Sequence, residues 1–154
     1  MLGLIDVLSL TQEYALRVVY ALASYSSDQL VNHEKLSKQA KVPFAYLNKV
    51  FKSLRRAGLV EIRRGANGGV RLKKQSHQIT LADVIAAIKP MQEYDRCHSA
   101  KSNGRKHHCS LHAQLASAQQ AAWSVFISKT FQDLASDYKE CQLPILARRG
   151  RTKQ

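Results

Sequence analysis

Residues 44–72 read FAYLNKVFKSLRRAGLVEIRRGANGGVRL. In the first half, apolar residues at positions 47, 50, 51 and 54 have the spacing of one helix face, and Gly58 supplies a C-terminal stop. In the second half, residues 59–63 and 70–73 alternate apolar and polar side chains around the turn sequence RGANGG, as half-buried strands do. The stretch therefore predicts a helix over 44–57 followed by a two-stranded hairpin.

A shorter helix precedes this one across a tight turn. Asn32 is a suitable N-cap for residues 33–40, and Pro43 disfavours helical geometry at Val42 while suiting the first turn of the next helix. Upstream, apolar residues at helical spacing predict a mostly buried helix over 11–25 with Thr11 as its N-cap. Helix, turn, helix and hairpin form a winged helix-turn-helix, in which one helix enters the major groove of DNA.

The pattern returns to helix after the hairpin. Thr80 and Asp83 resemble a capping box, and Pro90 marks the end of that helix. Residues 90–110 are irregular and polar, after which a long helix from about residue 111 carries an apolar seam that needs a partner surface. Thr130 with Asp133 can cap a last short helix. The expected fold class is mainly α with a small β wing: a winged helix-turn-helix domain over 8–77, dimerisation helices over 78–138, and a basic, disordered tail over 139–154.

Positive charge is concentrated in one part of the 154-residue chain, whose formal net charge is +13. Residues 35–74 hold twelve basic side chains and one acidic side chain, Glu61, a net charge of +11, whereas the other 114 residues together carry +2. An ordinary solvated surface mixes the two signs. This local excess over the helix-turn-helix and hairpin predicts double-stranded DNA as the partner.

The apolar residues of helix 44–57 are expected to face the core, so its remaining, mostly polar residues are the candidates to face DNA. Asn48 has the donor and acceptor to pair with adenine and Lys49 can reach guanine, whereas Lys52 and the two arginines that follow suit phosphates. The hairpin adds a backbone or minor-groove contact. The candidate DNA-binding residues are Ala45, Tyr46, Asn48, Lys49, Lys52, Arg55, Arg56, Arg64 and Gly65.

Several other classes are disfavoured. No run of about 18 apolar residues spans a membrane, and residues 1–10 lack the pattern of a secretory signal. Three cysteines, an odd number, favour a reducing cytoplasm with thiols or a metal over a disulfide framework. A zinc enzyme is disfavoured because no HExxH motif, phosphate loop or suitably spaced general base accompanies the cysteines and histidines. We therefore expect a cytoplasmic protein that is not an enzyme.

Five segments resemble the IscR/NsrR/CymR family of bacterial winged-helix repressors: TQEYALR (11–17), YL (46–47), LRRAGLV (54–60), RGANGGVRL (64–72) and ITLADV (79–84). The resemblance covers roughly residues 8–138, and the glycine-rich hairpin is its most specific part. It implies a homodimer joined by the long helix, with one winged helix on each half-site of a palindromic operator. Many members of that family also hold an iron-sulfur cluster in the loop before the long helix, so the resemblance implies a candidate cluster site in the loop 90–110 of this chain.

Cluster-binding members carry three cysteines in that loop, and IscR has a histidine three residues after the last. In this chain, Cys97 and Cys109 stand at the first and third cysteine positions of that pattern, and His112 stands at the position of the histidine. The middle cysteine position is occupied by Asn103. Glu13 aligns with a position from which some relatives send a carboxylate across the dimer, which makes it a candidate fourth ligand. Cys141 lies off the ligand positions.

This donor set favours a 2Fe-2S over a 4Fe-4S cluster, because it offers only two thiolates. His98, His107 and His108 are alternatives to Glu13 as the fourth ligand. Two other interpretations stay open: the same mixed thiolate and imidazole ligands suit zinc, and the chain can be a cluster-free regulator that senses thiol oxidation or a partner protein.

Overall fold

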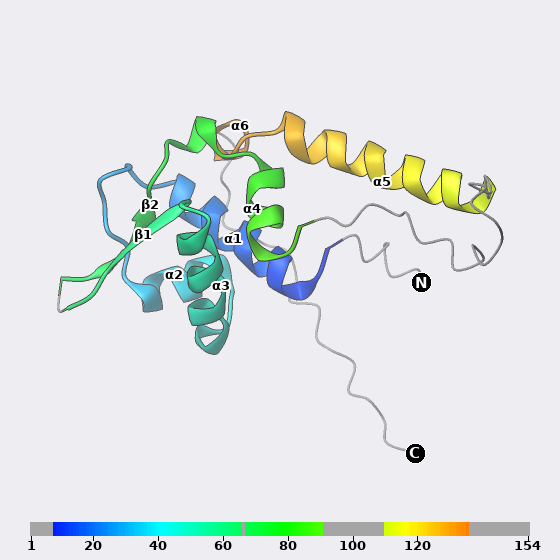
Figure 1. The fold of residues 1–154 in the computed structure, drawn as a ribbon. Helices are drawn as coiled ribbons and strands as arrows, with labels where there is room; N and C mark the ends of the chain where they lie inside the picture. The colour runs from blue at the N-terminus through cyan, green and yellow to red at the C-terminus, as the bar shows by residue number, and fades with distance from the viewer. Residues whose placement is uncertain (1–7, 66, 91–109, 136–154) are drawn as a thin grey trace, which may run out of the picture.

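The computed structural model describes residues 8–65, 67–90 and 110–135 (Figure 1). Its elements follow in the order α1 (Leu10–Ala23), α2 (His33–Ala40), α3 (Phe44–Arg56), β1 (Val60–Arg63), β2 (Gly69–Leu72), the short 3-10 helix η1 (Ser76–Gln78), α4 (Leu81–Ile88), α5 (Ser110–Ser128) and α6 (Phe131–Ala135). A mainly helical chain with one two-stranded antiparallel sheet is the predicted fold class. That prediction is confirmed.

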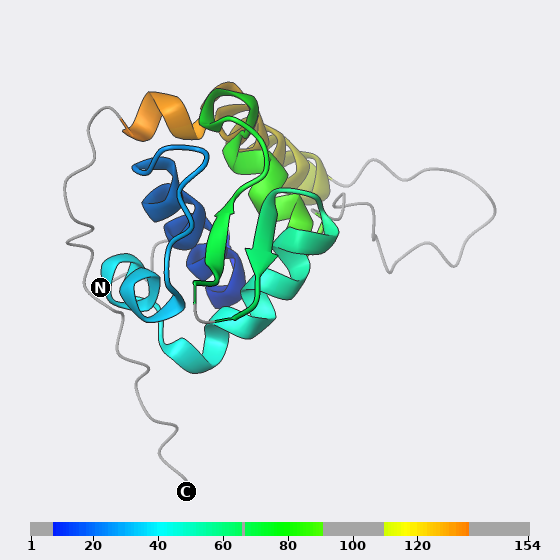
Figure 2. The same cartoon turned by 90° about the vertical axis from the view of Figure 1, so that its left-hand side faces the viewer.

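Helix α1 lies at the centre of the domain, and α2, α3, α4 and α6 pack around it (Figures 1 and 2). Ala15, Val18 and Val19 of α1 have no exposed surface. The four apolar residues predicted to form the inner face of α3 are all buried: Leu47, Val50, Phe51 and Leu54. Burial of these two apolar stripes against each other holds α3 with its charged face outward.

Side-chain caps fix where the helices begin. Asn32 accepts a 2.7 Å hydrogen bond from the backbone N–H of Glu34, and Thr80 forms the predicted capping box at the start of α4. The N-cap of α1 differs from the prediction: Ser9, and not Thr11, caps this helix. The reason is reciprocal bonding, because the Ser9 backbone N–H donates to the Gln12 side chain at 2.9 Å while Gln12 N–H donates back to the serine hydroxyl.

The hairpin β1–β2 is the wing. Its register sets Val60 opposite Leu72 and Ile62 opposite Val70. Outside the predicted hairpin, Val31 adds a third line of pairing, exchanging two 2.9 Å backbone hydrogen bonds with Val70. A Cβ at Gly69 would lie 2.6 Å from the carbonyl oxygen of Val31, so this closely approaching backbone requires glycine.

Helix α5 leaves the domain and is fastened to it at its C-terminal end (Figure 1). Residues 129–131 run antiparallel to 79–81, with Leu81 N–H donating to the Lys129 carbonyl at 3.1 Å and Phe131 N–H donating to the Ile79 carbonyl at 3.0 Å. The Phe131 side chain is buried against α1. Along the rest of α5, apolar side chains are exposed, among them Leu111 at 62% and Val125 at 56%.

Several predicted features lie outside the described residues: Cys97, Asn103, Cys109, Cys141, the histidines at 98, 107 and 108, and the tail 139–154. His112 falls within α5, but its side chain is also outside the described part. Over the described residues, none of the helices has both the length and the apolar character needed to cross a membrane.

Candidate nucleic-acid interface

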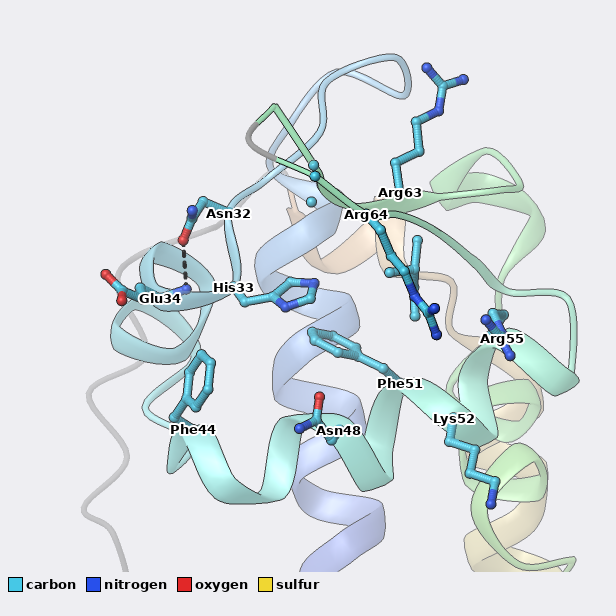
Figure 3. A pocket seen from close by; sticks show the side chains of 14 residues that line it. Asn32, His33, Glu34, Phe44, Asn48, Phe51, Lys52, Arg55, Arg63 and Arg64 are labelled. Atoms are coloured by element: carbon cyan, nitrogen blue, oxygen red, sulfur yellow. Dashed lines mark hydrogen bonds between the residues drawn. The ribbon is translucent and has the colours of Figure 1, made fainter.

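A groove of about 530 Å³ lies between the start of α2, helix α3 and the wing (Figure 3). Five of the residues predicted to bind DNA line it: Asn48, Lys52 and Arg55 from α3, and Arg64 and Gly65 from the wing. The helix and the hairpin therefore present their polar side chains to one shared concave surface. We call this surface, with its lining residues, the wing groove.

Helix α3 carries two exposed rows of side chains, and only one of them faces the wing groove. Asn48, Lys52 and Arg55 belong to the row that lines the groove. Ala45, Lys49 and Arg56 are also exposed, but they do not line it. All six are predicted DNA contacts, and the structure divides them between the groove and the neighbouring side of the helix.

Tyr46 differs from the other predicted contacts. Its side chain is half-buried and packs against the core, with its ring edge-on to Tyr14 of α1 at a centroid distance of 5.4 Å. This contact ties α3 to α1 through two aromatic rings, an arrangement that favours edge-to-face geometry. The ring of Tyr46 is thus a packing surface, and at most its outer part faces solvent.

The wing has a tightly built turn that positions Arg64. Gly65 has a φ of +110°, which side chains rarely adopt, and its carbonyl accepts a 2.9 Å hydrogen bond from Gly68 N–H. A Cβ on Gly68 would overlap the carbonyl oxygen of Arg63. Arg64 projects from this turn across the groove toward α3, on the side where Arg55 lies (Figure 3).

The single acid of the basic segment is neutralised within the wing. Glu61 accepts hydrogen bonds from Arg71 at 2.8 Å and from Arg63 at 3.1 Å, and these two guanidinium groups lower the pKa of its carboxyl. Within the described part of the chain, Lys52, Arg55 and Arg64 form no ion pair. Their charges stay available to an anion in the groove.

The groove also includes residues that the sequence prediction missed. Phe44, at the start of α3, lines it and is 52% exposed. His33, at the start of α2, lies with its ring 4.9 Å from that of Phe51, and its Nε2 atom is buried without a hydrogen-bond partner among the described residues. Phe44 was recognisable in the sequence, because it stands one helical turn before Asn48 on the same row. His33 was not, since its place depends on how α2 packs beside the wing.

Glu13, the proposed carboxylate ligand, lies on α1, and its side chain is 35% exposed. Its carboxylate accepts a 2.5 Å hydrogen bond from Nη2 of Arg17, whose own side chain is only 8% exposed. The Nε and Nη1 atoms of Arg17 have no hydrogen-bond partner in the described structure. Among the residues described, His, Cys, Asp and Glu side chains nowhere gather in a group of three suited to a metal.

This fold and groove define a DNA-binding protein of the winged helix-turn-helix class. The match to a family model makes the class more specific: residues 8–137 match Rrf2, described as an iron-dependent transcriptional regulator, and the chain belongs to this family. Rrf2 proteins are transcriptional regulators and not enzymes, which confirms both the predicted resemblance and the expectation that the chain is not an enzyme.

Individual relatives agree with the family. The HTH-type transcriptional regulator NsrR of Bacillus licheniformis is 35% identical over 99 residues, a match that spans 64% of this chain and 66% of NsrR. Among solved structures, the global cysteine regulator CymR (YrzC) of B. subtilis superposes with a TM-score of 0.70 at 24% identity, covering 90% of this chain and all of CymR. IscR of T. potens gives 0.69 at 22% identity, covering 88% of this chain and 90% of IscR. The two structures show a shared fold.

Proposed function

We propose that this regulator is a cytoplasmic repressor that binds a palindromic operator as a homodimer, with α3 in the major groove and the wing on the adjacent backbone. The observation that carries the proposal is the wing groove, which Lys52, Arg55 and Arg64 all line; none of the three forms an ion pair among the described residues, and the one acidic residue in the lining, Glu34, is bonded to none of them. Phosphates are recognised by such cations, whereas the amide of Asn48 beside them can read a base edge. A helix-turn-helix dimer reads two half-sites about one helical turn apart.

The test is a selection of bound sequences from random DNA duplexes by the full-length protein. We expect an enriched palindrome whose half-sites lie about 10 base pairs apart from centre to centre, and a footprint over both. Binding to this palindrome should persist at salt concentrations that abolish binding to unrelated duplexes, because contacts to phosphates alone weaken steeply with salt. Equal affinity for all duplexes at every salt concentration would reject sequence-specific regulation.

The homodimer is supported by the exposed apolar side chains of α5. Leu111, Leu115 and Val125 are exposed and lie on one face of a helix that extends away from the core, whereas the exposed Ile127 lies on the other side of this helix. An apolar helical seam of this kind is buried against a second helix, and a two-fold dimer places the same seam on both sides. Sedimentation of the wild type and of Leu115→Lys tests this. The charge should convert dimer to monomer, and a wild type that sediments as a monomer at all concentrations would contradict the proposal.

The chemistry of the candidate ligand residues shows which kind of iron-sulfur cluster they would fit. Cys97, Cys109, His112 and Glu13 supply two thiolates, one imidazole and one carboxylate, a set that fits 2Fe-2S better than 4Fe-4S. Glu13 is partly exposed on α1, and Arg17, which donates to one of its carboxylate oxygens, would orient the group so that the other oxygen could bind iron. Bound there, the cluster would supply sensitivity to oxidation. These four residues are our proposed ligands.

Anaerobic purification followed by an ultraviolet-visible spectrum and iron and zinc analysis tests this sensor. We expect brown protein with about two irons per chain, the content of one 2Fe-2S cluster, and colourless protein after Cys97→Ser. Cys141→Ser is the matched control, because this cysteine is off the proposed ligand set and its loss should leave the iron content unchanged. Colourless, iron-free wild type that still binds its operator would reject the cluster.

A cluster-free regulator of the same fold is the second candidate, and Asn103 is the observation that favours it, since it replaces the middle cysteine of the cluster-binding pattern. In this case oxidation of Cys97 or Cys109, or a partner protein, sets the affinity for DNA. Zinc held by the same side chains would be detected by the metal analysis above. If the wild type is iron-free and its operator affinity still responds to oxidation, while the double variant Cys97→Ser/Cys109→Ser binds with the same affinity under reducing and oxidising conditions, thiols are the sensor.

A further inference from the structure

Phe44 stands apart from its neighbours on the groove-facing row of α3. Going along this row from the N-terminal end, the side chains are Phe44, Asn48, Lys52 and Arg55 at steps of four, four and three residues, all of which line the wing groove (Figure 3). Three of the four are polar or charged, and the fourth is an aromatic ring that is 52% exposed. One exposed apolar side chain is ordinary on a protein surface, but its place in this row is not.

Position along α3 separates two kinds of contact. The N-terminal residues of a recognition helix contact base edges, whereas cations further along suit the phosphates. Phe44 is the first residue of α3 and Asn48 lies one turn later. Four residues of helix rise about 6 Å, a length that spans about two base pairs of DNA. Phe44 and Asn48 therefore face base pairs that are neighbours or nearly so.

We propose that Phe44 reads the C5-methyl group of a thymine in the major groove, next to the adenine that Asn48 reads. The inference rests on the proposed function and names the base chemistry that this part of the groove selects. The phenyl ring has no donor or acceptor, and in the major groove the thymine methyl is the one apolar feature that the bases present. Against a polar base edge, the ring would strip water from groups and leave them unpaired.

The contact gives a distinct signature because thymine and uracil differ only by this methyl group. Replacing a thymine in one of the two half-sites with deoxyuridine leaves base pairing unchanged and removes the apolar partner of Phe44 there. Loss of one buried methyl corresponds to about fourfold weaker binding at each half-site. We expect this loss at one thymine position of the half-site, one or two base pairs from the adenine assigned to Asn48. A cytosine that replaces this thymine should bind more tightly as 5-methylcytosine than as cytosine.

The experiment measures fluorescence anisotropy of the selected operator with the full-length protein and scans every thymine as deoxyuridine. In Phe44→Ala, the fourfold effect at that position should vanish, and in Phe44→Leu, which keeps an apolar side chain, part of it should remain. Lys49→Ala is the matched control from the other exposed row: it should weaken binding to all operators and leave the deoxyuridine pattern unchanged. Because Phe44 is exposed, all variants should unfold at temperatures close to that of the wild type.

Two results would overturn the inference. One is equal binding of the wild type to thymine and deoxyuridine operators at every position, and the other is full wild-type sensitivity to deoxyuridine in Phe44→Ala. Either outcome leaves the proposed function standing, because an operator has then been selected. Failure to enrich any sequence is a different result, which would overturn the proposed function and this inference with it.

Discussion

Replacing Phe131 with alanine tests whether the end of the long helix belongs to the winged-helix core. The phenyl ring is 1% exposed and packs in the cluster that also contains the buried face of α1. Beside it, the backbone of residues 129–131 pairs with 79–81 through the hydrogen bonds of Leu81 and Phe131 N–H. The ring therefore anchors α6, and through it the C-terminal end of α5, to α1.

The expected cost follows from this burial. Truncation of a fully buried phenylalanine to alanine lowers the free energy of unfolding by about 3–5 kcal/mol, because burial is lost and a cavity remains. A domain of this size has a stability of about 5–15 kcal/mol, so the change removes a large share of it. Phe44→Ala is the matched control: the same atoms are removed from a side chain that is half exposed, and a decrease of about 1 kcal/mol or less is expected.

Urea unfolding followed by circular dichroism measures both variants. With a denaturant slope of about 2 kcal/mol per M, Phe131→Ala should shift the midpoint downward by about 2 M, and Phe44→Ala by about 0.5 M or less. The transition of Phe131→Ala should remain single, since α1 and α6 share one core. Equal midpoints for the two variants would refute the reasoning, and so would a separate early transition confined to α5 and α6.

Three further predictions concern the wing and the groove. Gly69→Ala should lower the free energy of unfolding by about 1–2 kcal/mol in thermal melts, because its Cβ would press on the Val31 carbonyl and break the two hydrogen bonds between residues 31 and 70. The lowered pKa of Glu61 contributes stability above its ordinary value of 4.5 that is lost as the pH falls below it, so the urea midpoint of Glu61→Gln should depend less on pH in that acidic range than that of the wild type. Lys52→Gln should reduce the log–log slope of operator affinity against salt by about one unit, because one phosphate would then keep its counterion on binding, whereas Lys89→Gln, on the C-terminal side of α4 and outside the groove, should leave the slope unchanged.

The helices and the wing were predictable because their signals are local. The spacing of apolar residues predicts α3 within one residue of its observed end, and the caps at Asn32 and Thr80 set the starts of α2 and α4. The predicted N-cap of α1 is wrong because Ser9 and Thr11 are both good capping residues, and only the reciprocal bond with Gln12 distinguishes them. The 3-10 helix η1 and the pairing of Val31 carry no periodic signal, since both depend on tertiary packing.

The candidate interface was predictable as a charge pattern but not as a shape. Counting charges places it on α3 and the wing, because an excess of one sign over forty residues is visible without coordinates. A charge count does not show that Arg63 forms an ion pair with Glu61 while Arg64 does not. That difference arises because successive side chains of an extended backbone point to opposite sides. Nor does the count show that Lys49 and Lys52 line different sides of one helix relative to the wing.

Helix α1 contacts α3, which lines the wing groove, and carries Glu13, one of the residues proposed to sense. On one side, Tyr14 contacts Tyr46 of α3, and on another the buried amide of Gln12 donates to the carbonyls of Ile85 and Lys89 at the end of α4. Glu13 lies between Gln12 and Tyr14 in the sequence. Because close-packed interiors transmit strain, we expect a shift of the first turn of α1 to reach both α3 and α4. A ligand bound at Glu13 would therefore act on the angle of α3 through one helical turn, and the wing groove requires no direct contact with the sensor.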